Sequence, residues 1–139
     1  MERDIEKTVR IGMLGAASIG DWGLVQPVRA VDGVELYAVA ARDVDRARSY
    51  ADKRKIPVVH DSYDALLADP HIDAIYNPLP NSLHCEWTIK ALDAGKHVLC
   101  EKPFSANADE ARQMAESAER NDRALMEAMP CGFTPWPLE

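Results

Sequence analysis

The chain has 139 residues, of which 47% are hydrophobic and 28% are charged. This length suits one domain, and the composition suits a soluble protein with a packed core. The formal net charge is −7, with 23 acidic residues against 16 basic ones, and no run of basic residues stands out. We therefore expect no nucleic-acid-binding surface.

The sequence also lacks signals for a membrane or for secretion. No apolar stretch approaches the roughly 18 residues that a membrane-spanning helix needs. The N-terminal segment MERDIEKTVR is charged and has no apolar centre of the kind found in signal peptides. The three cysteines have neither an even number for pairing nor the spacing of metal ligands. We interpret them as reduced thiols and predict a cytoplasmic location.

Strand and helix signals alternate along the chain. Short apolar runs predict strands, and segments with apolar residues at helical spacing predict the helices between them. The predicted strands are Val9–Leu14, Glu35–Ala41, Val58–Val59, Ala74–Asn77, His97–Cys100 and Ala124–Met129. The predicted helices are Ile19–Val31, Asp43–Lys55, Ser62–Ala68 with Asp61 or Ser62 as its cap, Ser82–Ala94, and Asn107–Asn121. This alternation predicts an α/β fold, a Rossmann-type doubly wound parallel sheet of about six strands with helices on both faces.

A glycine-rich turn follows the first predicted strand. In GAASIG, the residues Gly15, Ala17 and Gly20 occupy the three fixed positions of the G-x-G-x-x-G dinucleotide-binding pattern. The first allows a tight turn, the second lets the backbone approach a pyrophosphate, and the third lets the helix pack closely on the strand. Ala17 departs from the pattern by one methyl group. Because the pattern opens a helix, it predicts pyrophosphate binding at the helix N-terminus, and a tight turn without a ligand is the alternative.

The end of the second predicted strand indicates the cofactor preference. Sites for NAD place an acidic residue there to bind the ribose hydroxyls, but this chain has Ala41 followed by Arg42. A guanidinium can bind a 2′-phosphate and stack on the adenine. The sequence therefore favours NADP(H) over NAD(H). In the alternative interpretation, Arg42 pairs with Asp43 or Asp45 on the helix surface.

Two later segments carry a family resemblance. They are IYNPLPNSLHCEWTIKALDAGKHVLCEKP, from Ile75 to Pro103, and the following ANADEARQMAESAE. Together with GMLGAASIG and VAARD, they resemble the N-terminal domain of the Gfo/Idh/MocA family, the glucose–fructose oxidoreductase and inositol dehydrogenase family. The resemblance covers about Val9 to Met129. The AARD segment is similar to that of the NADP-dependent trans-dihydrodiol dehydrogenases within the family.

The resemblance implies an activity and a catalytic residue. Such enzymes move a hydride between a nicotinamide and a hydroxyl-bearing carbon of a sugar, polyol or diol. In the family, the lysine of the E-K-P tripeptide lies beside the nicotinamide and the substrate, which implies that Lys102 is catalytic. Glu101 and Pro103 then shape the turn that presents it. Partial burial of Lys102 would suit its amine to proton transfer, and a surface lysine after a strand is the alternative.

The P-N-x-x-H element completes the expected site. It corresponds to Pro80, Asn81 and His84 and lies near the nicotinamide ribose in the family. His84 can equally be a structural residue at a helix N-terminus. No metal ligand is expected. The expected cofactor-binding residues are Gly15, Ala16, Ala17, Ser18, Ile19, Gly20, Ala41, Arg42, Asn77, Pro78, Leu79, Pro80, Asn81, His84, Glu101, Lys102 and Pro103.

Other conspicuous side chains are expected to be structural or without functional signal. His97 precedes an apolar strand, and Cys100 lies within it as a small core residue. We interpret Trp22, Met114 and Met126 as packing residues. The loop residues His60 and His71 carry no functional signal.

The resemblance also implies a second domain that this chain lacks. Relatives are expected to be more than twice as long, and their second half supplies most of the substrate pocket. The tail PCGFTPWPLE does not match the family's continuation, but a one-base shift at the Cys131 codon can encode R-F-H-P-M-A, which does. We hypothesise a frameshift near residues 129–131, natural or introduced in cloning. Residues 1–129 are then the dinucleotide-binding domain and residues 130–139 an irregular tail.

These expectations define three hypotheses about the function of the chain. In the first, the chain is the NADP(H)-binding part of an oxidoreductase and is inactive alone, because a small-molecule substrate requires the second domain. In the second, it is a non-catalytic NADP(H)-binding or sensing module, or a partner subunit. The third, a Rossmann-like domain for S-adenosylmethionine, is disfavoured by the E-K-P segment. We also expect exposed apolar surface to favour self-association.

Overall fold

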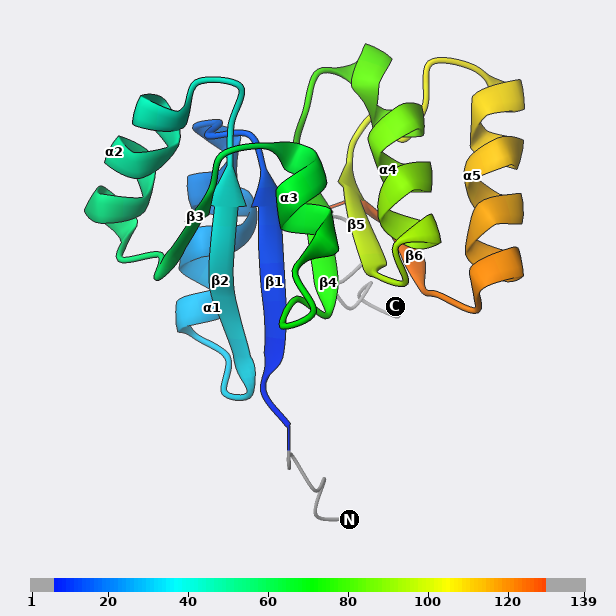
Figure 1. Ribbon diagram of the computed structural model, residues 1–139. Helices are drawn as coiled ribbons and strands as arrows, with labels where there is room; N and C mark the ends of the chain where they lie inside the picture. The colour runs from blue at the N-terminus through cyan, green and yellow to red at the C-terminus, as the bar shows by residue number, and fades with distance from the viewer. Residues whose placement is uncertain (1–6, 130–139) are drawn as a thin grey trace, which may run out of the picture.

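The computed structural model describes residues 7–129, which form one all-parallel sheet of six strands. The strands are β1 (Val9–Leu14), β2 (Val34–Ala40), β3 (Val58–His60), β4 (Ala74–Asn77), β5 (His97–Glu101) and β6 (Leu125–Ala128). Their order in the sheet is β3-β2-β1-β4-β5-β6. This is the strand order of the Rossmann fold, so the predicted fold class is confirmed (Figure 1).

Helices cover both faces of the sheet. One face carries η1 (Asp21–Val25), α1 (Gln26–Arg29) and α2 (Val44–Arg54). The other carries α3 (Tyr63–Ala68), η2 (Asn81–Leu83), α4 (His84–Asp93) and α5 (Ala108–Asn121) (Figure 1). Side chains of neighbouring strand residues point to opposite faces, so they divide the core into two buried clusters. Met13 and Tyr76 belong to the cluster under α2, whereas Leu14 and Ile75 belong to the cluster under α3 and α4.

Capping residues explain where α2 and α3 begin and where α2 ends. The Asp43 carboxylate accepts two backbone N–H groups from the first turn of α2. The hydroxyl of Ser62 accepts the backbone N–H of Ala65, so Ser62 is the cap of α3 and Asp61 is not. Lys55 ends α2 in the left-handed conformation.

The first helix departs from the regular helix predicted over Ile19–Val31. Its central part, η1, is a π-helix, and the helical segment ends at Arg29. Single π-helical turns are frequent at functional sites. Here the π-helical segment directly follows the glycine turn and brings the backbone of Gly23 against Tyr76 and Glu101.

Part of the sheet remains open in the described residues. On the face that carries η1 and α2, β5 and β6 have no helix over them, so Trp22 is 82% exposed and Met126 is 51% exposed. The prediction that both are packing residues is therefore wrong. Met114, on the opposite face, is fully buried as predicted.

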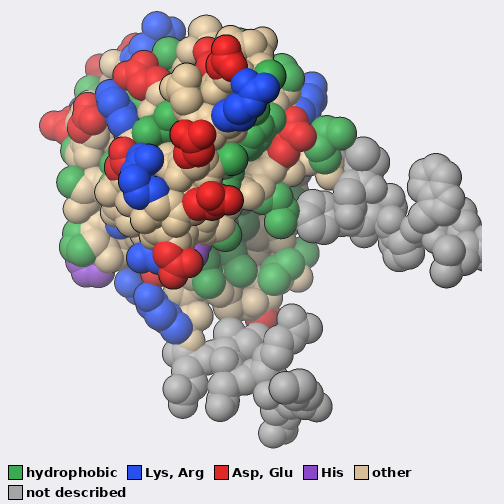
Figure 2. Space-filling view, turned by 90° about the vertical axis from the view of Figure 1, so that its right-hand side faces the viewer, with side chains coloured by type: hydrophobic (Ala, Val, Ile, Leu, Met, Phe, Trp, Pro, Cys, Tyr) green, Lys and Arg blue, Asp and Glu red, His purple; other side chains and the backbone are tan. Residues whose placement is uncertain are grey.

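The described surface carries charges of both signs. Figure 2 shows acidic and basic side chains interspersed on one face, with hydrophobic side chains gathered toward its lower part. None of the described helices is long and apolar enough to cross a membrane.

Candidate functional site

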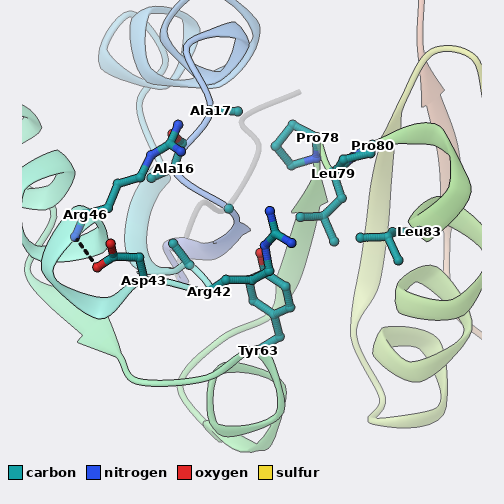
Figure 3. Close-up of a pocket in the computed structure, with 12 residues that line it drawn as sticks. Ala16, Ala17, Arg42, Asp43, Arg46, Tyr63, Pro78, Leu79, Pro80 and Leu83 are labelled. Atoms are coloured by element: carbon teal, nitrogen blue, oxygen red, sulfur yellow. Dashed lines mark hydrogen bonds between the residues drawn. The ribbon is translucent and has the colours of Figure 1, made fainter.

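A cavity of about 550 Å³ lies at the carboxyl edge of the sheet, between the glycine turn and the residues that follow β2 and β4 (Figure 3). β1 and β4 are neighbours in the sheet, and the chain leaves them toward opposite faces. Parallel sheets bind ligands at such a switch point. Predicted residues that line the cavity are Gly15, Ala16, Ala17, Ala41, Arg42, Pro78, Leu79 and Pro80. Residues that the sequence did not single out are Asp43, Arg46, Tyr63 and Leu83.

The two glycines of the turn are required by its geometry. Gly15 has a φ of 81°, and a Cβ there would lie 3.1 Å from Leu79 Cδ2. A Cβ on Gly20 would overlap the end of the Met13 side chain and lie 2.9 Å from the Tyr50 hydroxyl oxygen. The first and third positions of the pattern therefore have the roles that the sequence predicted, in the turn and in close helix packing.

The turn presents unpaired backbone donors. Within residues 7–129, no hydrogen-bond partner is found for the N–H groups of Ala16, Ala17 and Ser18, which precede the first helix. The nearby Asp21 carboxylate is neutralised by Arg54, whose hydrogen bonds lower the pKa of Asp21. Free N–H groups at a helix N-terminus fit a pyrophosphate.

Two arginines border the same cavity. Arg42 extends into it in Figure 3 and forms no ion pair with any described residue, because Asp43 caps α2 and Asp45 pairs with Arg48. The alternative in which Arg42 pairs on the helix surface is therefore not observed. Arg46, one helical turn later, donates from Nη2 to the Ala16 carbonyl at 3.0 Å.

An aromatic side chain forms another wall of the cavity. The Tyr63 ring lies beside Arg42 in Figure 3 and packs edge-on against Trp87, with ring centroids 4.9 Å apart. Burial raises the pKa of Tyr63, so its hydroxyl stays protonated at neutral pH. This wall is suited to the flat surface of a nucleobase.

Two of the predicted residues lie beneath the cavity and support it. The side-chain oxygen of Asn77 accepts the backbone N–H of Leu79 at 3.2 Å, and its amide donates to Thr88 at 3.1 Å. His84 is 1% exposed, and its ring nitrogens lie 2.7 Å from the Leu79 carbonyl oxygen and 2.8 Å from that of Pro103. His84 thus joins the cavity loop to the E-K-P turn, and it is the first residue of α4, where the structural interpretation placed it.

A second cleft, of about 500 Å³, lies on the other side of the glycine turn. It is lined by Ile19, Trp22, Glu101, Lys102 and Met126 among others. Lys102 is exposed there. The described residues do not provide the partial burial that would suit Lys102 to proton transfer, because none of them covers β5 and β6 on this face.

Hydrogen bonds fix the carboxylate of Glu101. The hydroxyl of Tyr76, which is fully buried, donates to Glu101 Oε1 at 2.5 Å, and the backbone N–H of Lys102 donates to Oε2 at 3.2 Å. Burial and the neighbouring carboxylate raise the pKa of Tyr76, which keeps it a donor. The peptide bond between Lys102 and Pro103 is cis.

The glycine turn connects the two clefts. Ala17 lines the first, Ser18 lines a shallow pocket beside it, and Ile19 lines the second. A dinucleotide crossing the turn would therefore place one end near Arg42 and the other near Lys102.

Asn81 begins η2, and its buried side-chain oxygen has no partner among residues 7–129.

The remaining candidate side chains have structural roles. His97 accepts the backbone N–H of Ala124 at 3.0 Å, as its structural interpretation predicted. Cys100 is fully buried, and burial raises its pKa to about 11. His60 and His71 both contact the Asp69 carboxylate. No cluster of metal-ligating side chains occurs within the described part of the chain.

Comparisons with known proteins agree with this geometry. The model of the Gfo/Idh/MocA oxidoreductase family, NAD-binding Rossmann fold, matches residues 9–129. The chain is 46% identical over 124 residues to the NADP(+)-dependent D-xylose 1-dehydrogenase 2 of Haloferax volcanii, covering 89% of this chain and 38% of that protein. It is 36% identical to the trans-1,2-dihydrobenzene-1,2-diol dehydrogenase of Danio rerio, covering 94% of this chain and 40% of that protein.

A solved structure shows the same fold. The 3-ketoreductase KijD10 of Actinomadura kijaniata, in complex with NADP and TDP-benzene, superposes with a TM-score of 0.82 at 36% identity. The match covers 87% of this chain and 37% of KijD10. The chain thus spans less than half the length of the relatives it matches. With a family match over nearly all of its described residues, the chain belongs to the Gfo/Idh/MocA oxidoreductase family through its NAD-binding Rossmann domain.

Proposed function

We propose that the chain is the NADP(H)-binding domain of an oxidoreductase that acts on a hydroxyl-bearing carbon. The adenosine end lies in the Arg42 cavity, the pyrophosphate lies on the turn from Gly15 to Gly20, and the nicotinamide points toward Lys102. One observation carries the proposal: free backbone N–H groups and two arginine side chains border a single cavity at the switch point of the sheet.

The preference for NADP(H) rests on the charges at the adenosine end. Ala41 stands where an acidic residue would bind the ribose hydroxyls of NAD, and Arg42 is free to pair with a 2′-phosphate. Arg46 adds a second positive charge at the same wall. Among the described residues that line this cavity, Asp43 carries the one carboxylate, and it is engaged in capping α2. Asp61 and Asp64 line an adjoining pocket that Arg42 also borders, and neither forms an ion pair with Arg42. The Haloferax enzyme and KijD10, described with NADP, support this choice.

In the complete enzyme, Lys102 is the catalytic residue. When bound, the nicotinamide supplies or accepts the hydride. The Lys102 ammonium donates a hydrogen bond to the substrate oxygen and exchanges a proton with it at Nζ. Glu101, held by Tyr76, fixes the backbone N–H of Lys102 and thereby the turn that presents it. The substrate is a sugar, polyol or diol, or the corresponding ketone.

Isothermal titration calorimetry tests the cofactor assignment. The wild-type chain is expected to bind NADP⁺ about tenfold or more tightly than NAD⁺, since a charge-assisted pair is worth about 1.5–3 kcal/mol. Arg42→Ala is expected to remove most of this preference and to leave NAD⁺ binding nearly unchanged. Arg112→Ala, an exposed arginine on α5, is the matched control. Equal binding of the two dinucleotides by the wild type would contradict the NADP(H) preference.

A second candidate is a dinucleotide-binding module without turnover. It is favoured by the open cleft around Lys102, where Trp22 and Met126 are exposed and no described residue closes a substrate pocket. Both candidates expect this chain alone to bind NADP⁺ without turnover, which measuring NADP⁺ reduction with a panel of polyols tests. Robust turnover would contradict the module and would show that this chain alone forms an active enzyme.

A further inference from the structure

Three side chains on α2 reach the glycine turn or the helix that follows it. Arg46, Tyr50 and Arg54 are spaced by four residues and therefore lie on one face of α2. Arg46 donates to the Ala16 carbonyl at 3.0 Å. The Tyr50 hydroxyl lies 3.3 Å from the Ala17 carbonyl oxygen. Consecutive carbonyl groups of the turn are thus held from the same helix.

Holding these carbonyls determines where the next N–H groups point. In a planar trans peptide, the carbonyl oxygen and the following N–H point in opposite directions. With the oxygens of Ala16 and Ala17 directed toward α2, the N–H groups of Ala17 and Ser18 are directed away from it. These are two of the N–H groups that have no partner within residues 7–129.

Tyr50 is itself fixed in position. Its side chain is buried, and the Arg54 guanidinium lies 3.6 Å from the centre of its ring. Arg54 also pairs with Asp21, whose carboxylate oxygen is 3.2 Å from the Tyr50 hydroxyl. Burial raises the pKa of Tyr50 to about 12, so the hydroxyl remains a donor, shared between Ala17 and Asp21, at neutral pH.

We propose that α2 positions the phosphate-binding turn, with Arg46 and Tyr50 holding it so that its N–H groups face the pyrophosphate of a bound dinucleotide. The inference rests on the proposed function and extends it to residues outside the glycine pattern. Tyr50 does not line the Arg42 cavity; it lines the shallow pocket beside it, together with Ala16 and Ser18 of the turn. It is therefore a positioning residue, not a ligand-binding one.

Tyr50→Phe tests the proposal because it removes the hydroxyl and keeps the ring. Its dissociation constants for NADP⁺ and NAD⁺ are expected to rise about fivefold, the effect of one hydrogen bond. Affinity for adenosine 2′-monophosphate, which has no pyrophosphate, is expected to stay unchanged. A purely structural role would weaken all three ligands or none. Tyr37→Phe, a half-buried tyrosine of β2 away from the turn, is the matched control, and thermal unfolding checks each variant.

Arg46→Ala provides a second, independent test at an exposed position of α2 where alanine favours the helix. NAD⁺ has no 2′-phosphate, so weaker NAD⁺ binding by this variant reports on the turn and not on charge pairing with a phosphate at the ribose. We expect a loss of about fivefold here as well. If wild-type chain binds neither dinucleotide, the proposed function fails and this inference with it. If the wild type binds and both variants bind NAD⁺ as tightly, the inference alone is overturned.

Discussion

Replacing Gly23 by alanine tests the packing that holds Glu101 beside Lys102. A Cβ at Gly23 would overlap the hydroxyl oxygen of Tyr76 and lie 3.1 Å from Glu101 Oε1. Tyr76 is fully buried in β4 and bonded to Glu101 in β5, so neither group can move aside freely. The alanine must therefore displace the helix, the hydroxyl or the carboxylate.

The expected change in the free energy of unfolding results from two opposing effects. Overpacking a rigid site costs about 1–3 kcal/mol, and replacing glycine by alanine in a helix returns at most about 1 kcal/mol. We expect a net loss of about 1–2 kcal/mol for Gly23→Ala. Tyr76→Phe alone removes a hydrogen bond to a carboxylate, worth about 1.5–3 kcal/mol. In that background the nearest ring atom, Cζ, is 3.4 Å from the new Cβ, which is an ordinary contact. Glu101 Oε1, 3.1 Å from the Cβ, has lost its bond to the hydroxyl and can move by a few tenths of an ångström, so Gly23→Ala should cost little.

Urea unfolding of the wild type, both single variants and the double variant measures the coupling. The double variant is expected to be more stable than the sum of the single effects predicts, by about 1–2 kcal/mol. Gly23→Ala combined with Tyr37→Phe is the matched control and should be additive. Additivity within about 0.5 kcal/mol for the Gly23 and Tyr76 pair would refute the close approach that we describe.

Three further predictions concern the contacts of His84, the pH dependence of the free energy of unfolding, and the open face of the sheet. His84→Ala should lower the free energy of unfolding by about 3 kcal/mol, because it leaves a cavity and removes the ring nitrogens that contact the carbonyl oxygens of Leu79 and Pro103; a loss under about 1 kcal/mol in urea unfolding would contradict its bridging role. The pKa of Asp21 is lowered by hydrogen bonds from Arg54, so this carboxylate stabilises the fold above its unfolded pKa near 4 and loses that effect as the pH falls through the lower folded value. Asp21→Asn should therefore be less stable than wild type at neutral pH, with the gap closing under acid, and a constant gap in thermal unfolding would contradict this. Finally, we expect the chain to self-associate through the open sheet face where Trp22 and Met126 are exposed. The double variant Trp22→Lys, Met126→Lys should weaken this self-association in sedimentation equilibrium. A wild-type chain that stays monomeric at high concentration would contradict the prediction.

The local signals in the sequence predicted the architecture well. Short apolar runs between helical segments predicted all six strands, because buried parallel strands are short and apolar on both faces. Caps such as Ser62 could be predicted because they act through their own neighbours in sequence. The same holds for Gly15, whose positive φ is set by the tight turn in which it occurs.

Features that depend on long-range contacts could not be predicted. Arg46 was missed because its contact with Ala16 joins segments thirty positions apart and leaves no trace in helical periodicity. The bond between Tyr76 and Glu101 similarly joins neighbouring strands. Trp22 was interpreted as a packing residue from its type alone, but its exposure depends on which elements cover β5 and β6.

Nuclear magnetic resonance of the ¹⁵N-labelled chain tests the central claim, that a dinucleotide binds across the glycine turn, most directly. Titration with NADP⁺ is expected to shift the amide signals of Gly15 to Gly20 and of Ala41 and Arg42, where the cavity lies. The amides of α5, which line no part of that cavity, are expected to stay unchanged. Saturating NADP⁺ that leaves the signals of the glycine turn in place would contradict the account.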